Sequence, residues 1–502
     1  MIVPLLILLV VLFLVHQYLW RRRGYPPGPT PIPIFGNLFQ LSGSKAPGIS
    51  IFEKWRDQYG PMFTFYMGPV PFVVLTDYQD LKETFIKDGE TYADKYLSPE
   101  FNKYFRGGEY GIMDISGDRW REHRKFAVLQ LRELGVGKTR MESKILIEAE
   151  ELIRKLRKQE QDDDEFVLQS DVDIAVGSVI NQFLFGYRFD DSRLHEFVKI
   201  KTLVNNFMEE VGKPLGVLAF TCHGIPELMI RWMVNGIEEQ KRELFGFLRC
   251  QIQEAKMKID YDGDHSDDFV EAYLRKQHQR EEKQDYDSYC DPQLENVCFD
   301  IWAAGFDTLT NTIGFLIAYA INHPEMQRQI HQEIDEYLGH HRRLLTMSDK
   351  NSLVYFNAFA NETQRVANIL PLNLPHALTR DVELNGYKLR KGTGIIHQIA
   401  NVMTDEATFA NSDEFNPHRF IDENGKLKKI EEWCPFSMGK RQCLGEGLAR
   451  MEIFLLAANL FNYFEFLPAS DGLPSLFKDF SLVSHVIPYK CRVKSRNHEA
   501  VA

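Results

Sequence analysis

One cysteine lies in a sequence context that could give its sulfur a chemical role. Residues 435–445 read Pro-Phe-Ser-Met-Gly-Lys-Arg-Gln-Cys-Leu-Gly, so Cys443 follows a glycine-containing turn and precedes a helix predicted to begin near Gly445. Backbone N–H groups at a helix start and the nearby cation of Arg441 favour a thiolate over a thiol. A lone cysteine among apolar residues is more often a small buried side chain. On this loop, however, a thiolate is suited to bind haem iron, and the absence of Cys-x-x-Cys-His indicates that the haem would not be covalently attached.

A second candidate for chemistry is an acid next to an alcohol inside an apolar helix. Residues 303–308 read Ala-Ala-Gly-Phe-Asp-Thr. Ala304 and Gly305 place little bulk beside Thr308, so the helix could open locally and leave room for a small ligand. Asp307 and Thr308 together could deliver protons there. The ordinary alternative is that the threonine hydroxyl faces solvent or bonds to its own helix backbone.

Two further pairs have the spacing of one helical turn. Glu362 and Arg365 are three residues apart, which in isolation is a common surface pair worth ~0.2–0.5 kcal/mol. Trp120 and Arg124 are four residues apart and share one face of a predicted helix. By composition alone that helix could simply be an amphipathic surface helix.

The elements that must position these residues are mostly helices. Apolar residues recur at three- and four-residue spacing around 140–160, 195–212, 230–257, 292–321, 324–338 and 446–464. Short alternating runs at 62–66 and 72–75 predict strands. The charged segments 158–165 and 276–287 are predicted to be solvated connections. No second linker interrupts the chain after about residue 48.

Taken together, these motifs resemble those of a known family. The cysteine segment matches the haem-binding signature Phe-x-x-Gly-x-Arg-x-Cys-x-Gly of the cytochrome P450 superfamily. The chain resembles an animal microsomal P450 of the family-two-like group from its amino terminus to Arg492. The resemblance implies a mainly α fold with small β-sheets (α+β) and an N-terminal transmembrane helix. It also implies a monooxygenase that holds haem b through Cys443 and inserts one oxygen atom from O2 into a hydrophobic substrate.

The resemblance also implies roles for individual residues. Asp307 and Thr308 would be catalytic and Cys443 would bind the metal. Glu362, Arg365 and Arg419 would form a buried structural network that sets the position of the cysteine loop. The residues implied to bind the cofactor, four of them as partners of the haem carboxylates, are Trp120, Arg124, Ala304, His376, Phe436, Gly439, Arg441 and Gly445.

Substrate contacts implied by the resemblance are apolar and aromatic. They are Phe101, Phe105, Ile112, Phe207, Leu218, Phe220, Phe299, Ala303, Ile369, Leu370 and Val483. Such a lining predicts a hydrophobic substrate, a lipid, fatty acid, steroid or xenobiotic. Each of these residues taken singly is more often part of the packed core.

Composition limits the partners. Among 502 residues, 59 Lys and Arg stand against 71 Asp and Glu, a net charge of −12 that disfavours nucleic acid. Neither a flavin nor a nicotinamide signature is present, so electrons must come from a partner. The resemblance implies an NADPH-dependent P450 reductase, with cytochrome b5 as a second candidate donor. Arg121, Lys125, Arg132 and Lys440 could form a local basic patch for it.

The amino terminus predicts attachment to a membrane. Residues 1–20 are predicted to be a signal anchor, followed by a basic and proline-rich linker over 21–47 and a haem-thiolate catalytic domain over 48–502. A cleaved signal peptide is the competing interpretation. Three arginines after the apolar run place the catalytic domain on the cytoplasmic side, and the resemblance implies the endoplasmic reticulum. Seven scattered cysteines favour a reducing compartment.

Two other functional classes stay open. One is a P450-like isomerase or dehydratase that does not use O2. The other is a membrane-tethered carrier of haem or lipid without enzymatic activity. The acid and alcohol at 307 and 308 favour the monooxygenase over both.

Overall fold

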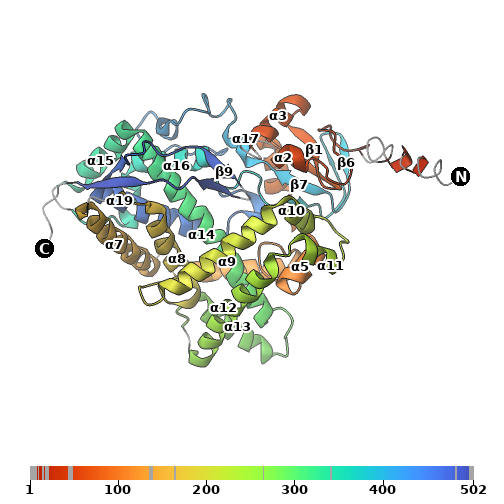
Figure 1. The fold of residues 1–502 in the computed structure, drawn as a ribbon, viewed down its shortest axis with the longest axis horizontal. Helices are drawn as coiled ribbons and strands as arrows, with labels where there is room; N and C mark the ends of the chain where they lie inside the picture. Colours follow the sequence, from red (N-terminus) through yellow and green to blue (C-terminus); the bar gives the residue numbers. More distant parts are fainter. Residues whose placement is uncertain are drawn as a thin grey trace.

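The structure is a computed structural model that describes residues 22–42, 49–134, 139–162, 165–263, 265–339, 342–480 and 483–496, with residues 8, 9, 11–13 and 16. Figure 1 shows β1, β6 and β7 beside α2 and α3 at one end of the molecule, and long helices across the rest. The fold is mainly helical with small sheets, as the sequence predicts.

The main sheet has five strands. Their order is β1 (Met62–Met67), β2 (Val70–Leu75), β7 (Gly394–His397), β4 (His376–Ala377) and β3 (Asp94–Lys95). β1 and β2 form an antiparallel hairpin, and β2 runs parallel to β7. Three further pairs are β5 (Val382–Leu384) with β6 (Tyr387–Leu389), β8 (Phe464–Pro468) with β11 (Cys491–Ser495), and β9 (Lys478–Phe480) with β10 (Ser484–Val486).

Both faces of the β1–β2 hairpin are buried because its side chains alternate between two apolar clusters. Phe63 and Phe72 pack with α3 on one face. Val73 lies on the other face in a cluster that includes Phe85 and Met438. Since Met438 belongs to the cysteine loop, the sheet supports that loop from one side.

The helices build the larger part of the core around α14, whose residues are mostly apolar and mostly buried. The α-helices are α2 (Leu38–Ser42), α3 (Ile49–Tyr59), α4 (Tyr78–Leu81), α5 (Pro99–Arg106), α6 (Gly117–Glu133), α7 (Thr139–Gln161), α8 (Leu168–Phe185), α9 (Leu194–Gly212), α10 (Pro214–Thr221), α11 (Glu227–Met233), α12 (Ile237–Lys258), α13 (Phe269–Glu281), α14 (Asp291–Asn322), α15 (Pro324–Leu338), α16 (Val354–Ala367), α17 (Ile399–Met403), α18 (Glu446–Glu452) and α19 (Asn459–Tyr463). Shorter helical turns are η2 (Lys82–Lys87), η3 (Met347–Ser352), η4 (Pro417–Phe420), η5 (Gly439–Arg441) and η6 (Ile453–Ala458).

Most of the predicted periodic segments are helices, and the structure differs from the predictions in three places. The predicted connection over 158–165 is wrong for its first part, since α7 continues to Gln161. The segment 230–257 is divided between α11 and α12, because Gly236 caps a new helix instead of continuing the old one. The predicted connection over 276–287 is wrong for its first part, since α13 continues to Glu281. Its charged residues are consistent with a helix because Lys, Arg, Gln and Glu are good helix formers.

The amino-terminal predictions are only partly within the described residues. The anchor predicted over residues 1–20 lies almost wholly outside them, and no helix that the structure describes is long and apolar enough to cross a membrane. The proline-rich segment is packed on β1: the Pro27 carbonyl accepts from the Thr64 N–H at 2.9 Å. A Cβ at Gly28 would lie 1.8 Å from the Thr64 carbonyl oxygen, so a glycine is required there.

Candidate functional site

The cysteine loop is a compact turn that fits against η2. The Cys443 N–H donates to the Phe436 carbonyl at 2.9 Å, and Gly445 caps the start of α18, as predicted. Gly439 has a φ of 75°, and a Cβ there would lie 2.1 Å from the Phe85 carbonyl oxygen. Only glycine permits both the backbone conformation and this close approach. The glycine therefore fixes the loop on η2.

The surroundings of Cys443 have opposing effects on the pKa of its thiol. Burial raises the pKa of the Cys443 thiol, whereas the Gly445 N–H and the Arg124 guanidinium lower it. The helix start thus lowers the thiol pKa, as the sequence predicts, but burial raises it by more. A bound metal ion deprotonates a coordinating thiol outright. Cys443 as a whole residue is nevertheless exposed, although many protein atoms surround it.

A cluster of cations lies next to this sulfur. Arg124 of α6 donates to the carbonyl of Gln442, the residue before Cys443. The Arg441 guanidinium lies 3.7 Å from the ring centre of Trp120, and it donates to the Ala93 carbonyl at 2.7 Å. Burial and then the charge of Arg124 lower the pKa of Arg441 to about 9. Keeping the Arg441 guanidinium charged in this cluster therefore costs free energy.

His376 and Lys95 extend the same cluster from the sheet. His376 Nδ1 lies 2.6 Å from the Tyr92 carbonyl oxygen, and its Nε2 lies 3.1 Å from Lys95 Nζ. Burial and then the charge of Arg441 lower the pKa of Lys95. The sequence analysis missed Lys95, because a lysine on a two-residue strand carries no signal until β3 and β4 pair and bring it to His376.

The middle of α14 differs from the rest of that helix in being accessible. Ala304 is exposed and Thr308 is half-buried, while Phe299 and Ala303 are buried. The helix continues unbroken through this segment, so the predicted local opening is not present. Thr308 Oγ1 donates to the Ala304 carbonyl at 2.8 Å, which is the ordinary arrangement for a threonine inside a helix.

Comparison with known proteins identifies the family. The sequence profile described as Cytochrome P450 matches residues 26–493. The chain belongs to the cytochrome P450 family. Cytochrome P450 2C3 of Oryctolagus cuniculus is 35% identical over 468 residues, 90% of this chain and 91% of that protein. Cytochrome P450 2C25 of Mesocricetus auratus is 33% identical over 474 residues, 92% of each chain. Cytochrome P450 2H1 of Gallus gallus is 32% identical over 489 residues, 93% of each chain.

Family membership makes this chain a P450 monooxygenase, and the family implies a haem held by a cysteine thiolate. The residues around Cys443 fit such a group. The Trp120 indole Nε1 is buried with no hydrogen-bond partner among the described residues. Within the same part of the chain, Lys95, Arg124 and Arg441 form no ion pair with a carboxylate of the protein. A Cβ added at Gly445 would meet no protein atom within 4 Å. A haem would supply the missing carboxylates and fill this space.

The predicted structural network of this P450 is present, with two of its three members fully buried and Arg419 partly buried. Glu362 accepts from Arg365 Nε at 2.7 Å and from Arg419 Nε at 3.0 Å, and Glu362 and Arg365 are 0% exposed. Arg365 also donates to the Met403 carbonyl at 3.0 Å. The Asn416 N–H donates to Glu362 at 2.9 Å. The network therefore ties α16 to the chain over 403–419, which leads into the cysteine loop.

The predicted substrate residues other than Ala303 divide into four groups. Phe101, Phe105, Phe207, Phe220 and Phe299 form one aromatic cluster, in which the rings of Phe105 and Phe207 stack at 4.2 Å. The backbone of the second group, Ile112, is fixed: its N–H donates to Asp300 and its carbonyl accepts from Arg441. Leu218 packs in the cluster over the β1–β2 hairpin and is not brought to the aromatic cluster.

The remaining residues predicted to contact substrate lie at element ends. Ile369 and Leu370 follow α16 and are half-buried, while Val483 precedes β10 and is buried. The Ser484 N–H donates to the Ile369 carbonyl at 2.8 Å, so these two segments adjoin.

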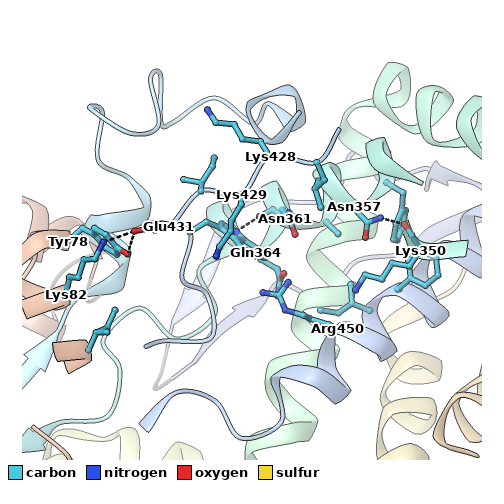
Figure 2. Close-up of a pocket in the computed structure, with 18 residues that line it drawn as sticks. Tyr78, Lys82, Lys350, Asn357, Asn361, Gln364, Lys428, Lys429, Glu431 and Arg450 are labelled. Carbon is cyan, nitrogen blue, oxygen red and sulfur yellow. Dashed lines mark hydrogen bonds and ion pairs between the residues drawn. The ribbon is translucent and has the colours of Figure 1, made fainter. Parts of the chain in front are cut away.

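A pocket of about 550 Å³ lies among α16, α18 and the segment 427–433 (Figure 2). Its lining is rich in cations: Lys82, Lys350, Lys428, Lys429 and Arg450, with Glu431 as the one acid among the residues that line it. The Arg450 guanidinium lies 4.8 Å from the Phe436 ring centre, which connects the pocket wall to the cysteine loop. Burial and then Arg450 lower the pKa of Lys350 to about 8. Neither Cys443 nor a predicted substrate residue lines this pocket.

Proposed function

We propose that this P450 uses Cys443 as the thiolate ligand of haem b and oxidises a hydrophobic small molecule with O2. One observation carries the assignment. Arg124 bonds to the Gln442 carbonyl and Arg441 stacks on Trp120, so cations that form no ion pair among the described residues adjoin Cys443. A ligand that brings both a metal for the sulfur and carboxylates for the cations satisfies this arrangement.

The chain's own residues then have distinct tasks. The residues that would hold the haem carboxylates are Trp120, Arg124, Arg441, His376 and Lys95. The haem, when bound, supplies the chemistry of O2 activation and accepts single electrons. Asp307 would carry protons toward the accessible part of α14 at Ala304 and Thr308. The aromatic cluster would exclude water.

The cysteine assignment is tested by Cys443→Ser. We expect the variant to lose the absorbance of the reduced, carbonyl-bound thiolate form, because a serine hydroxyl does not replace a soft thiolate. Cys434→Ala is the matched control: Cys434 is also on the loop and buried, and its variant should keep that absorbance. Unchanged absorbance in Cys443→Ser would refute the proposal.

The substrate class follows from the apolar cluster. Phe101, Phe105, Phe207 and Phe299 are aromatic, and Ala303 adds a small apolar side chain. Apolar and aromatic side chains of this kind suit lipids, fatty acids, steroids or xenobiotics. Titration of the purified protein with one member of each class, followed by the shift of the haem absorbance, measures which class binds. A response to polar, charged compounds alone would contradict the proposal.

Electrons would come from an NADPH-dependent reductase, with cytochrome b5 as a second donor. Two of the four predicted docking cations are neutralised within the chain, since Arg121 and Lys440 both pair with Glu90. Lys428 and Lys429 of the pocket form no ion pair in the described part of the chain and add to the patch. We therefore assign the acidic electron donor to the face of the protein that carries the cysteine loop and the pocket drawn in Figure 2.

Charge reversal tests this docking face. The double variant Lys428→Glu, Lys429→Glu should slow the first electron transfer from reductase, and the effect should shrink at high salt. Lys283→Glu, an exposed lysine after α13, is the control for charge alone. Equal electron-transfer rates in both variants would contradict the docking proposal.

Attachment to the endoplasmic reticulum membrane, with the catalytic domain in the cytosol, is supported by an apolar surface. Leu228 and Trp232 of α11 are 81% and 67% exposed, and Ile34 before α2 is 63% exposed. α2, α10 and α11 lie at the same end of the molecule (Figure 1). A Cβ at Gly68 would touch both Leu218 and the Ile34 carbonyl, so α10 and this segment adjoin. Such a surface is suited to a lipid interface.

A further inference from the structure

The acid of the acid–alcohol pair is bound by a histidine rather than by the alcohol. Asp307 Oδ2 lies 2.9 Å from His485 Nε2, and Asp307 Oδ1 accepts from Asn311 Nδ2 at 3.0 Å. The Thr308 hydroxyl donates to the Ala304 carbonyl instead. The Asp307 carboxylate therefore belongs to a contact between α14 and β10.

The strand that carries His485 is fixed on both sides. The Ser484 N–H donates to the Ile369 carbonyl at 2.8 Å, and the Val486 N–H donates to Asn311 Oδ1 at 2.9 Å. Asn311 thus bonds to the strand and to Asp307 at once. Because the backbone on each side of His485 is held, the imidazole is held next to the carboxylate.

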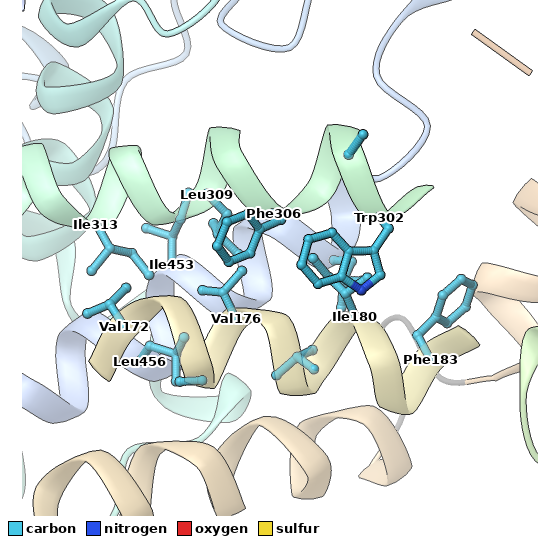
Figure 3. Close-up of a cluster of buried hydrophobic side chains, with 14 of the residues drawn as sticks. Val172, Val176, Ile180, Phe183, Trp302, Phe306, Leu309, Ile313, Ile453 and Leu456 are labelled. Atoms are coloured by element: carbon cyan, nitrogen blue, oxygen red, sulfur yellow. The ribbon is translucent and has the colours of Figure 1, made fainter. Parts of the chain in front are cut away.

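The other charged groups near Asp307 come from the helices that pack on α14. Figure 3 shows Val172 and Val176 of α8 packed against Leu309 and Ile313 of α14. Asp173 of α8 is buried and forms an ion pair with Lys201 of α9. Burial raises the pKa of Asp173, Lys201 opposes the rise, and the charge of Asp307 adds to it. Among the described residues, the charged and titratable groups around Asp307 are His485, Asp173 and Lys201.

The His485–Asp307 pair joins a water-accessible group to a more enclosed one. The side chain of His485 is 34% exposed, against 16% for Asp307. Imidazole is the side chain that gains and loses protons near neutral pH, so it can take them from water and pass them on. Asp173 and Lys201 already satisfy one another, and His485 is the side chain in contact with Asp307 Oδ2.

We propose that His485 is the positioning residue and proton relay for Asp307. The inference rests on the proposed function, because it concerns proton delivery to the site at Thr308. The imidazolium Nε2–H bond breaks as an Oδ2–H bond forms on Asp307, and the ring then regains a proton from water. The Oδ2–H bond of the protonated carboxyl then breaks as an O–H bond forms on a water molecule at the accessible face of α14 beside Thr308. No oxidant or reductant takes part in this transfer.

Two variants separate the relay from a purely structural contact. His485→Gln keeps an N–H donor for Asp307 but cannot exchange that proton, whereas His485→Leu removes both functions. His195→Gln is the matched control, because His195 is an exposed histidine of α9. The measured quantities are the fraction of NADPH electrons recovered as product and the solvent isotope effect on turnover, each between pH 6 and 8.

We expect both His485 variants to release several times more hydrogen peroxide per NADPH, with a larger solvent isotope effect and no pH dependence near neutrality. His195→Gln should match the wild type. A His485→Gln variant with wild-type product yield, isotope effect and pH profile would overturn the relay. If only His485→Leu were impaired, the contact would be structural and the relay would likewise be overturned.

A second readout does not depend on turnover. The melting temperatures of His485→Leu, Asp307→Asn and the double variant form a cycle, in which a direct pair gives a smaller combined shift than the sum of the single shifts. Strictly additive shifts would contradict the contact. If the wild type shows the normal carbonyl absorbance and the His485 variants match it in product yield, isotope effect and pH profile, the relay alone is refuted. Absence of that absorbance refutes the proposed function.

Discussion

At the scale of single residues, Glu362 has the most demanding environment. Its carboxylate is fully buried and accepts from Arg365, from Arg419 and from the Asn416 N–H. Glu362→Gln would leave two buried guanidinium groups without their anion. We expect the free energy of unfolding to fall by about 3–5 kcal/mol, measured by urea denaturation. Glu151→Gln, in an exposed pair with Arg154, should cause no measurable change, and an equal loss in both variants would contradict the argument.

A second residue-scale prediction concerns acid stability. Burial and then the charge of Arg496 lower the pKa of His331 to about 3 in the folded chain, against about 6.5 when unfolded. The unfolded state therefore binds more protons between these values, so stability is lost as pH falls below 6.5. The contribution is at most about 1.4 kcal/mol per pH unit. His331→Gln should flatten the fall of unfolding free energy between pH 6.5 and 4.5. An exposed-site control, His195→Gln, should keep the wild-type slope, and identical slopes in all three proteins would refute the assignment.

At the scale of elements, the fit of the cysteine loop against η2 depends on one glycine. Gly439→Ala would place a methyl group 2.1 Å from the Phe85 carbonyl oxygen in a backbone conformation that disfavours alanine. We expect the loop to shift and the protein to lose most of its bound haem, measured by the ratio of haem to protein absorbance. Gly246→Ala in α12 meets no atom within 4 Å and should keep its haem. Full haem content in Gly439→Ala would show that the loop does not need this contact.

At the scale of the whole molecule, the apolar surface of α11 should determine how the catalytic domain rests on lipid. Trp232 is 67% exposed, so its fluorescence should be quenched by brominated lipids in vesicles. The other tryptophans account for part of the quenching. Trp232→Phe should abolish most of the remainder. Leu228→Ser should weaken vesicle binding, whereas Met257→Ser, an equally exposed apolar residue of α12, should not. Equal binding by both serine variants would contradict a membrane role for α11.

The sequence alone was sufficient for the family, the mainly helical architecture and the local motifs. Periodicity predicts the long helices because a buried helix must repeat its apolar face every three to four residues. The cysteine signature and the Glu362–Arg365 spacing each involve residues close together along the chain, so the amino-acid sequence is enough to recognise them. The roles proposed for the separate site residues stay predictions that the variants above can test.

Tertiary structure decided which distant residues meet. Lys95 joins His376 only because β3 pairs with β4, and Glu90 neutralises Arg121 and Lys440 across segments that no motif connects. His485 likewise lies beside Asp307 although 178 residues separate them, because β10 packs on α14. Local spacing determines which side chains share a turn or a face, whereas electrostatic partners depend on how elements pack. That packing is set by the burial of many apolar side chains at once, which no single motif encodes.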